Sequence, residues 1–280
     1  MRSHTPSSSV ADRAREVQLG LGERTAFSHV TAALLWGLPL PHALAGRADL
    51  DVMTRTRGGQ VVRTGCVGHR GLERRTVTLV DDVRVVSMAD TWCDLADLGR
   101  RRISTDDLVV IGDACVAALD ARSRAVIHPG ARTSPGVRAL HEALGGRVRP
   151  RGKVMLREAL QLIRPRVRSP MESRSRLMFI RAGFPEPEVN GIITDEGGGW
   201  LAEGDLVWRA EQVIGEYQGE AHGGITRRSR DASRSRLLAS RGWIVEELFA
   251  EDVFARPRRV DVLERMAGHL DLDPGTLLIA

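Results

Sequence analysis

Lysine is nearly absent from this sequence of 280 residues, since Lys153 is the only lysine among 41 basic residues. So complete a preference for arginine reflects a GC-rich genome as readily as it reflects phosphate binding. The net charge of +5 and the sequence pI of about 10.0 therefore do not by themselves identify a nucleic-acid-binding protein.

Two further absences exclude whole classes of protein. Cysteine occurs only at Cys66, Cys93 and Cys115, without metal-ligand spacing, which argues against a zinc module or a disulfide framework and predicts buried free thiols. No window approaches the roughly 18 consecutive apolar residues of a membrane span, and the N-terminal stretch lacks the apolar core of a signal peptide. We therefore expect a cytoplasmic protein without a membrane partner.

The pattern of residues 1–150 predicts a mixed α+β domain of unknown role. A helix is expected from about Ser28, as N-cap, to Trp36, because Gly37 and two prolines follow. Strand-like runs cover 48–54, 60–69 and 83–88, and amphipathic helices cover 87–99, 105–121 and 134–146. We place the domain boundary near residue 150, and the short helix after it can belong to either side.

Residues 151–280 predict an α/β domain with a mixed sheet. Its first helix, 169–184, has Ser169 at the N-cap, Pro170 at N1 and Glu172 at N3, the pattern of a capping box. Strands are expected at 186–194, 200–208, 211–219 and 243–249, with an arginine-rich helix at 226–241 and a last helix at 256–270. This order, three strands in a meander followed by a helix, a strand and a helix, is typical of an α/β domain with a mixed sheet.

Two acids occupy neighbouring strands of this predicted sheet. A turn near 209–211 would bring Asp205 opposite Glu216, and Gln218 projects to the same face as Glu216. Two carboxylates a few Å apart repel each other unless a cation lies between them. Mg²⁺ prefers such oxygen ligands, so the pair predicts a magnesium site. The alternative is two ordinary acids at the ends of exposed strands.

The surrounding blocks resemble one branch of a nuclease superfamily. "SPMESRSR", "GDLVW", "VIGEYQGEAH" and "RDASRSRLLASRGWIVEELF" occur in the order that is typical of the DUF559 branch of the PD-(D/E)XK endonucleases, which is related to the very-short-patch repair enzymes. The resemblance covers roughly residues 165–270 and implies a restriction-endonuclease-like domain. It differs at one position, since Gln218 stands where such domains usually carry Lys or, in this branch, Asp.

The resemblance also implies a role for each site residue. Asp205 and Glu216 would bind Mg²⁺, or Mn²⁺ in its place, with the carbonyl of Tyr217 as a third ligand. Glu172 would hold a metal-bound water, unless it serves the capping box. Gln218 has no charge and can only orient a water or a phosphate by hydrogen bonds. His222 would act as a general acid or base, or bind phosphate.

Arginines gather in two runs of this second half, at 164–181 and 227–241, and such clusters can follow a phosphate backbone or form a solvated helical face. The candidates for contact with nucleic acid are Arg174, Arg176, Arg227, Arg228, Arg230 and Arg234. Trp200, Trp208 and Trp243 are expected to pack rather than to stack on bases.

The N-terminal blocks "FSHVTAALLWGLPLP" and "VRVVSMADTWCDLADL" resemble the region that precedes such domains in actinobacterial proteins named after AbiEi-type antitoxins. Too few residues precede the first block for the winged helix-turn-helix that usually begins those relatives. We expect a Mg²⁺-dependent nuclease that cleaves DNA. The alternatives are an inactive nuclease fold that binds nucleic acid, and an antitoxin-type regulator; a homodimer and a protein partner such as a toxin stay open.

Overall fold

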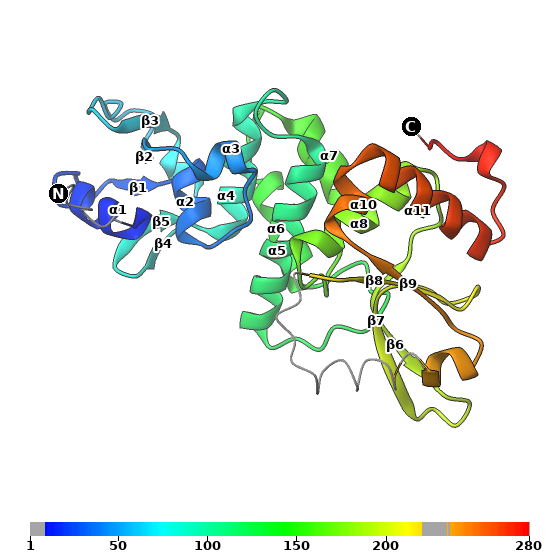
Figure 1. Cartoon of the computed structure of the whole chain (residues 1–280). Coiled ribbons are helices and arrows are strands. Elements are labelled where there is room, and N and C mark those ends of the chain that lie inside the picture. Colours follow the sequence, from blue (N-terminus) through cyan, green and yellow to red (C-terminus); the bar gives the residue numbers. More distant parts are fainter. Residues whose placement is uncertain (1–8, 220–233, 235, 280) are drawn as a thin grey trace, which may run out of the picture. The chain divides into compact units, whose positions relative to one another are not determined.

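The computed structural model describes residues 9–219, 234 and 236–279, and the chain divides into two compact units (Figure 1). Unit 1 comprises residues 1–123 and 135–163, and unit 2 comprises residues 124–134 and 164–280. Each unit contains helices and a mixed sheet, which confirms the α/β class. The division differs from a boundary near residue 150, because Lys153–Leu162 packs within unit 1 and 124–134 belongs to unit 2.

Unit 1 is built on a five-stranded sheet with the order β3-β2-β1-β5-β4. Its strands are β1 (Thr25–Phe27), β2 (Leu50–Thr54), β3 (Cys66–Arg70), β4 (Val77–Val80) and β5 (Val83–Val86). Its α-helices are α1 (Val10–Leu19), α2 (His29–Leu35), α3 (His42–Ala45), α4 (Met88–Leu95), α5 (Thr105–Ser123), α6 (Pro135–Gly145) and α7 (Lys153–Leu162), with short 3₁₀ turns at Leu72–Arg74 and Ala96–Leu98.

The core of unit 1 lies against this sheet. Phe27, Val52, Met53 and Val85 are almost completely buried and belong to one apolar cluster. Strand β1 joins β2, with which it is antiparallel, to β5, with which it is parallel. The sequence did not predict β1 or β4, because runs of three and four residues are too short to establish an alternation of apolar and polar side chains.

Unit 2 contains a four-stranded sheet with the order β6-β7-β8-β9. Its described elements are α8 (Pro170–Arg181), β6 (Glu188–Thr194), β7 (Trp200–Trp208), β8 (Val213–Tyr217), β9 (Ile244–Leu248), α10 (Ala250–Phe254), α11 (Arg256–His269) and a 3₁₀ turn at Pro274–Thr276. Strands β6, β7 and β8 form an antiparallel meander, and β9 lies parallel to β8. This confirms the mixed sheet and the strand positions expected from the sequence.

Alternation along the strands of unit 2 supplies two apolar layers. Leu206 and Trp208 pack with Phe179 of α8 and Met266 of α11 on one face of the sheet, the side on which α8, α10 and α11 lie (Figure 1). On the other face Val207 and Ile214 pack with Trp243 and Leu238. Both faces of the sheet are therefore covered by apolar packing, and the two candidate metal-binding acids lie where strands β7 and β8 separate.

Smaller expectations are settled by the same structure. The three cysteines are free thiols, as predicted, with Cys93 and Cys115 buried and Cys66 half-buried. Trp208 and Trp243 pack in the core, whereas Trp200 is 67% exposed and does not. Among the described residues, no helix is both long and apolar enough to cross a membrane.

Candidate functional site at the ends of strands β7 and β8

The two candidate metal-binding acids lie where strands β7 and β8 separate. The antiparallel pairing between the strands runs from Trp208↔Val213 to Leu206↔Gly215 and stops there. Continuing this register by one residue sets Asp205 opposite Glu216, as the sequence predicted. Since opposed residues of an antiparallel pair share one face, both carboxylates belong to the same face of the sheet.

The carboxylate of Asp205 reaches across to β8. Its Oδ2 accepts a hydrogen bond of 2.9 Å from the backbone N–H of Tyr217, the residue after Glu216. Burial raises the pKa of Asp205, while that N–H and the charges of Arg234 and Arg168 lower it in part. The negative charge of Asp205 is therefore incompletely compensated by the groups around it.

Glu216 forms an ion pair with Arg234. The guanidinium of Arg234 donates through Nη2 to Oε1 of Glu216 and to the backbone carbonyl of Glu203. Because the charge of Arg234 also acts on Asp205, this cation lies beside both acids. The position that a metal ion would neutralise is thus partly neutralised by an arginine.

Glu172 is buried at the start of α8, with only 6% of its surface exposed. Ser169 caps the helix by accepting the N–H of Glu172, as predicted. The carboxylate of Glu172 does not close the predicted capping box on Ser169 but accepts the N–H of Arg168, at 2.9 Å, and Nδ2 of Asn190, at 2.8 Å. Burial, with the nearby charge of Asp205, raises the pKa of Glu172.

Glu203 is a further acid near Asp205, on the same strand β7, that the sequence did not predict. Its two oxygens accept a bidentate pair of hydrogen bonds from Arg168, both 2.8 Å, and Oε1 accepts another from Arg166, at 2.9 Å. Asn190 connects this group to Glu172, since its Nδ2 also donates to the carbonyl of Arg166. The spacing of Glu203 and Asp205, two residues apart on one strand, was the available signal.

Gln218 follows β8 directly and is half-buried. Its backbone N–H donates to the carbonyl of Leu248, and its Nε2 lies 3.4 Å from Oε1 of Glu247. Glu247 is paired with Glu216 in the parallel register of β8 and β9. Glu247 is therefore a second acid that the sequence did not predict, and it lies beside Gln218 and Glu216.

Most of the first arginine run is engaged in contacts within unit 2. Arg176 is fully buried and pairs with Glu186, which corrects its assignment as a nucleic-acid contact. Arg164 pairs with the same Glu186. Arg174 is half-buried with its guanidinium 5.7 Å from the ring centre of Phe254. His222, Arg227, Arg228 and Arg230 lie outside the described residues.

The carboxylates of Asp205 and Glu216 fit Mg²⁺, although they are few. Within the described part of the chain, no group of three or more His, Cys, Asp or Glu side chains is placed to hold a metal. Magnesium, however, is commonly bound through one or two carboxylates, with waters and substrate phosphates completing its shell. Asp205 retains Oδ1, which makes no hydrogen bond to a described residue, and Glu216 is paired with Arg234.

We call Glu172, Asp205 and Glu216, with Arg168 and Arg234, the strand-end site. The fold and this site define an α/β protein whose second unit gathers acids where its two central strands, β7 and β8, separate. The chain is 36% identical over 123 residues to two uncharacterised proteins of Mycobacterium tuberculosis, MT2308 of strain CDC 1551 / Oshkosh and Rv2248 of strain ATCC 25618 / H37Rv. Each match covers 43% of this chain and 44% of the relative. No family model matches, and no solved structure does.

Proposed function

We propose that unit 2 is a Mg²⁺-dependent nuclease domain that hydrolyses phosphodiester bonds in DNA. The observation that carries the proposal is the meeting of Asp205 and Glu216 at the point where β7 and β8 separate. Two half-buried carboxylates on one face of the sheet repel each other unless a cation lies between them, and carboxylate oxygens are ligands that Mg²⁺ takes. The order of motifs along 165–270 agrees with this proposal.

Each residue of the strand-end site then has a distinct task. The N–H of Tyr217 fixes Oδ2 of Asp205, and Oδ1 would bind the cation. Glu172 holds Asn190 and the turn at Arg168 in place, so it is a positioning residue in this arrangement. The bound metal would polarise a water and offset charge on the scissile phosphate.

Arg234 is the residue that links metal binding to substrate. Its guanidinium is paired with Glu216 and would have to leave that carboxylate for the metal to enter. Guanidinium groups pair with phosphate as well as with carboxylate. We propose that an arriving phosphodiester takes Arg234 from Glu216, so that the metal site is completed only in the presence of DNA.

A second candidate function is supported by two of the same contacts. The Arg234–Glu216 pair partly compensates the acids without a metal, and Gln218 supplies no positive charge next to them. A unit that retains the fold but binds nucleic acid without cleaving it would show both features. The two candidates differ in one measurable property, metal-dependent cleavage.

The test is a cleavage assay of the full chain on single- and double-stranded DNA, with Mg²⁺ and with Mn²⁺, compared with a chelator. We expect cleavage that requires the metal and that falls by at least about 10²-fold in Asp205→Asn and in Glu216→Gln, since removal of one electrostatic stabiliser typically costs that much. The matched control is Glu246→Gln, a half-buried carboxylate on β9 that pairs with Arg265 instead.

Three outcomes are informative. Cleavage lost in the two site variants and retained in Glu246→Gln supports the nuclease. Metal-dependent cleavage that is unchanged in Asp205→Asn and Glu216→Gln excludes the strand-end site as its origin. Binding of DNA without any cleavage by the wild-type chain selects the second candidate.

A further inference from the structure

Unit 1 contains a polar pocket that the proposed nuclease does not use. The cavity measures about 350 Å³, and all the residues that line it belong to unit 1. Six of its lining side chains are arginines, against two aspartates, Asp94 and Asp97. Two histidines, His29 and His69, complete its polar wall. Its positive charge distinguishes it from an ordinary apolar ligand pocket.

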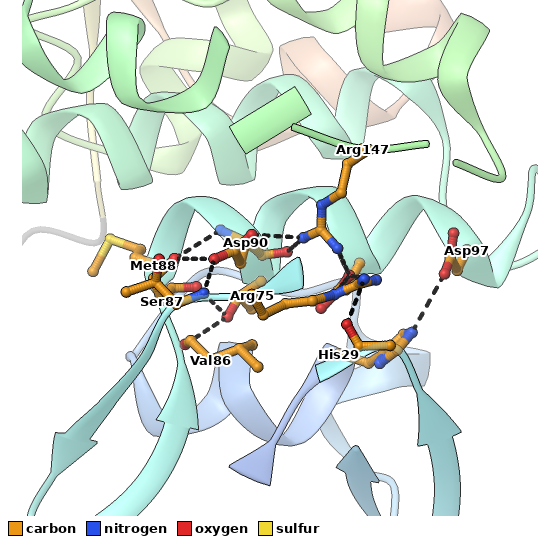
Figure 2. A network of polar contacts seen from close by, with 12 residues as sticks. His29, Arg75, Val86, Ser87, Met88, Asp90, Asp97 and Arg147 are labelled. Atoms are coloured by element: carbon orange, nitrogen blue, oxygen red, sulfur yellow. Dashed lines mark hydrogen bonds and ion pairs between the residues drawn. The ribbon is translucent and has the colours of Figure 1, made fainter. Parts of the chain in front are cut away.

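The floor of the pocket is held by a buried network of arginines and aspartates. Nη2 of Arg147 donates to the carbonyl and to Oδ1 of Asp90, at 3.0 and 2.9 Å, and Arg75 donates twice to Oδ1 of Asp94. Figure 2 shows Arg147 reaching from its own segment toward Asp90 and Arg75. We call Arg75, Asp90, Asp94 and Arg147 the α4 network, since both aspartates belong to α4.

The α4 network leaves polar atoms unsatisfied. The side chain of Arg147 is 4% exposed, yet its Nε has no hydrogen-bond partner, and Nη1 lies 3.0 Å from Oδ1 of Asp94 without making a hydrogen bond. Buried guanidinium N–H groups without partners are costly. Arg147 lines the pocket, so its buried positive charge adds to that of the other lining arginines.

The two histidines form a rigid stacked pair. Their ring centres are 3.7 Å apart at an interplanar angle of 19°. Nε2 of His69 lies 2.9 Å from Oδ1 of the buried Asp51, and Nδ1 of His29 contacts the hydroxyl of Ser28 at 2.9 Å. His29 also has a φ of 47°, a left-handed conformation that a non-glycine residue adopts only where its surroundings impose it.

Four arginines surround this fixed floor. They are exposed, and none of them forms an ion pair with a residue that the structure describes; they are Arg70, Arg74, Arg149 and Arg151. Like charges so close together repel each other and would be stabilised by a bound anion. Planar guanidinium groups match the oxygens of a phosphate in a bidentate way.

We propose that this pocket binds a ligand through a phosphate group, with the four rim arginines as the residues that recognise it. A volume of about 350 Å³ accommodates one small group and lies at the lower end of ordinary ligand sites. The same chemistry has two sources, a free nucleotide and the phosphorylated end of a nucleic acid strand. The proposal does not depend on the nuclease site, which lies in unit 2.

The test is a titration of the full chain, at fixed salt, with adenosine triphosphate and with a short single-stranded DNA that carries or lacks a 5′-phosphate. Adenosine without phosphate is the probe for binding that does not involve the phosphate. We expect Arg149→Ala and Arg70→Ala each to weaken binding of a phosphorylated probe about tenfold, the loss expected for a hydrogen bond to a charged group. Both positions are exposed, so the variants should fold, which far-ultraviolet circular dichroism checks.

The matched control is Arg138→Ala, because Arg138 is exposed on α6 and does not line the pocket. Binding of adenosine triphosphate that depends on the rim identifies a nucleotide as ligand. Binding only of the 5′-phosphorylated DNA, with the same dependence, identifies a nucleic acid end. If no phosphorylated probe binds, if adenosine binds as tightly as its triphosphate, or if Arg138→Ala weakens binding as much as the rim variants, the proposal is wrong.

Discussion

The α4 network of unit 1 and the strand-end site of unit 2 are built from the same types of residue, arginine and carboxylate, but hold them differently. In the α4 network Asp94 is 1% exposed and faces two arginines, and Asp90 accepts hydrogen bonds from Arg147, Ser87 and the N–H of Thr76. In the strand-end site Asp205 has a single backbone donor, and Glu216 pairs with an arginine that is 32% exposed.

This difference shows how position in the fold decides what a charged group can do. The acids of the α4 network sit on a helix whose first turn and neighbours offer several donors, so their charge is fixed in place. The acids of the strand-end site sit where two strands separate, and the backbone there offers one N–H instead of a continuous ladder. A carboxylate whose negative charge is not fully compensated can bind a cation or a proton.

The largest effect should follow from breaking the α4 network. Asp94→Ala leaves Arg75 and Arg147 without their shared carboxylate, and removing one partner of a buried charge pair costs about 3–5 kcal/mol of unfolding free energy. Urea unfolding followed by circular dichroism measures this loss. The same measurement on Glu216→Gln should give about 1 kcal/mol or less, as for exposed pairs, and equal losses for the two variants would contradict the comparison.

A large gain should follow from adding a positive charge to the strand-end site. Gln218→Lys supplies a group that stabilises developing negative charge, and we expect the cleavage rate to rise about 10²–10³-fold. Glu247 would compete for the new ammonium, because it already lies 3.4 Å from the Gln218 amide. The gain should therefore be larger in a Glu247→Gln background. Unchanged rates in both backgrounds would show that this side chain does not face the reacting phosphate.

The pH dependence of stability provides a third distinction between the strand-end site and the α4 network. Because the pKa of Glu172 is raised above its ordinary value of 4.5, the folded protein holds a proton there that the unfolded chain has lost. Its contribution is therefore present below pH 4.5 and is lost as the pH rises through the raised pKa. Glu172→Gln removes this titration, so the stability of the variant relative to the wild type should increase as the pH rises through this window.

Urea unfolding at several pH values from 4 upward tests this expectation. Asp205→Asn should behave in the same direction over a window that begins at 3.8, since the pKa of Asp205 is also raised. Glu246→Gln is the control, because Glu246 pairs with Arg265 outside the strand-end site. A difference between Glu172→Gln and wild type that does not vary with pH would count against the incomplete compensation described above.

The smallest effect on stability should come from Arg234. Arg234→Ala breaks a partly exposed ion pair and should change the unfolding free energy by about 1 kcal/mol or less. It removes one cation that competes for Glu216, however, so Mg²⁺ should bind more tightly in the absence of DNA, as isothermal titration calorimetry can measure. The control is Arg241→Ala. Arg241 is exposed and lies further along the chain, so this variant should leave the affinity for Mg²⁺ unchanged. Weaker binding of Mg²⁺ in Arg234→Ala would exclude the competition between arginine and metal.

Much of the fold of unit 2 could be predicted because its signals are local. Ser169 and Pro170 start α8 through the chemistry of their own side chains, and the alternation of Leu206, Val207 and Trp208 identifies a strand with two buried faces. The opposition of Asp205 and Glu216 was also accessible, because a short turn determines the register of a hairpin. Strand β1 of unit 1 was not, since its partners β2 and β5 are distant in the sequence. Strand β4 was not either, because its four residues are too few to establish an alternation, although its partner β5 follows directly.

By itself, the sequence determined the α/β class, the order of most elements of unit 2, the free cysteines and the placing of two acids on adjacent strands. All of these depend on side-chain periodicity, capping and turns, which act over a few residues. Only the tertiary structure decided which charges are engaged: Arg176 is buried against Glu186, Arg234 pairs with Glu216, and Arg147 meets Asp90 from 57 residues away. Ion pairing depends on distance in space and on burial, and neither follows from distance along the chain.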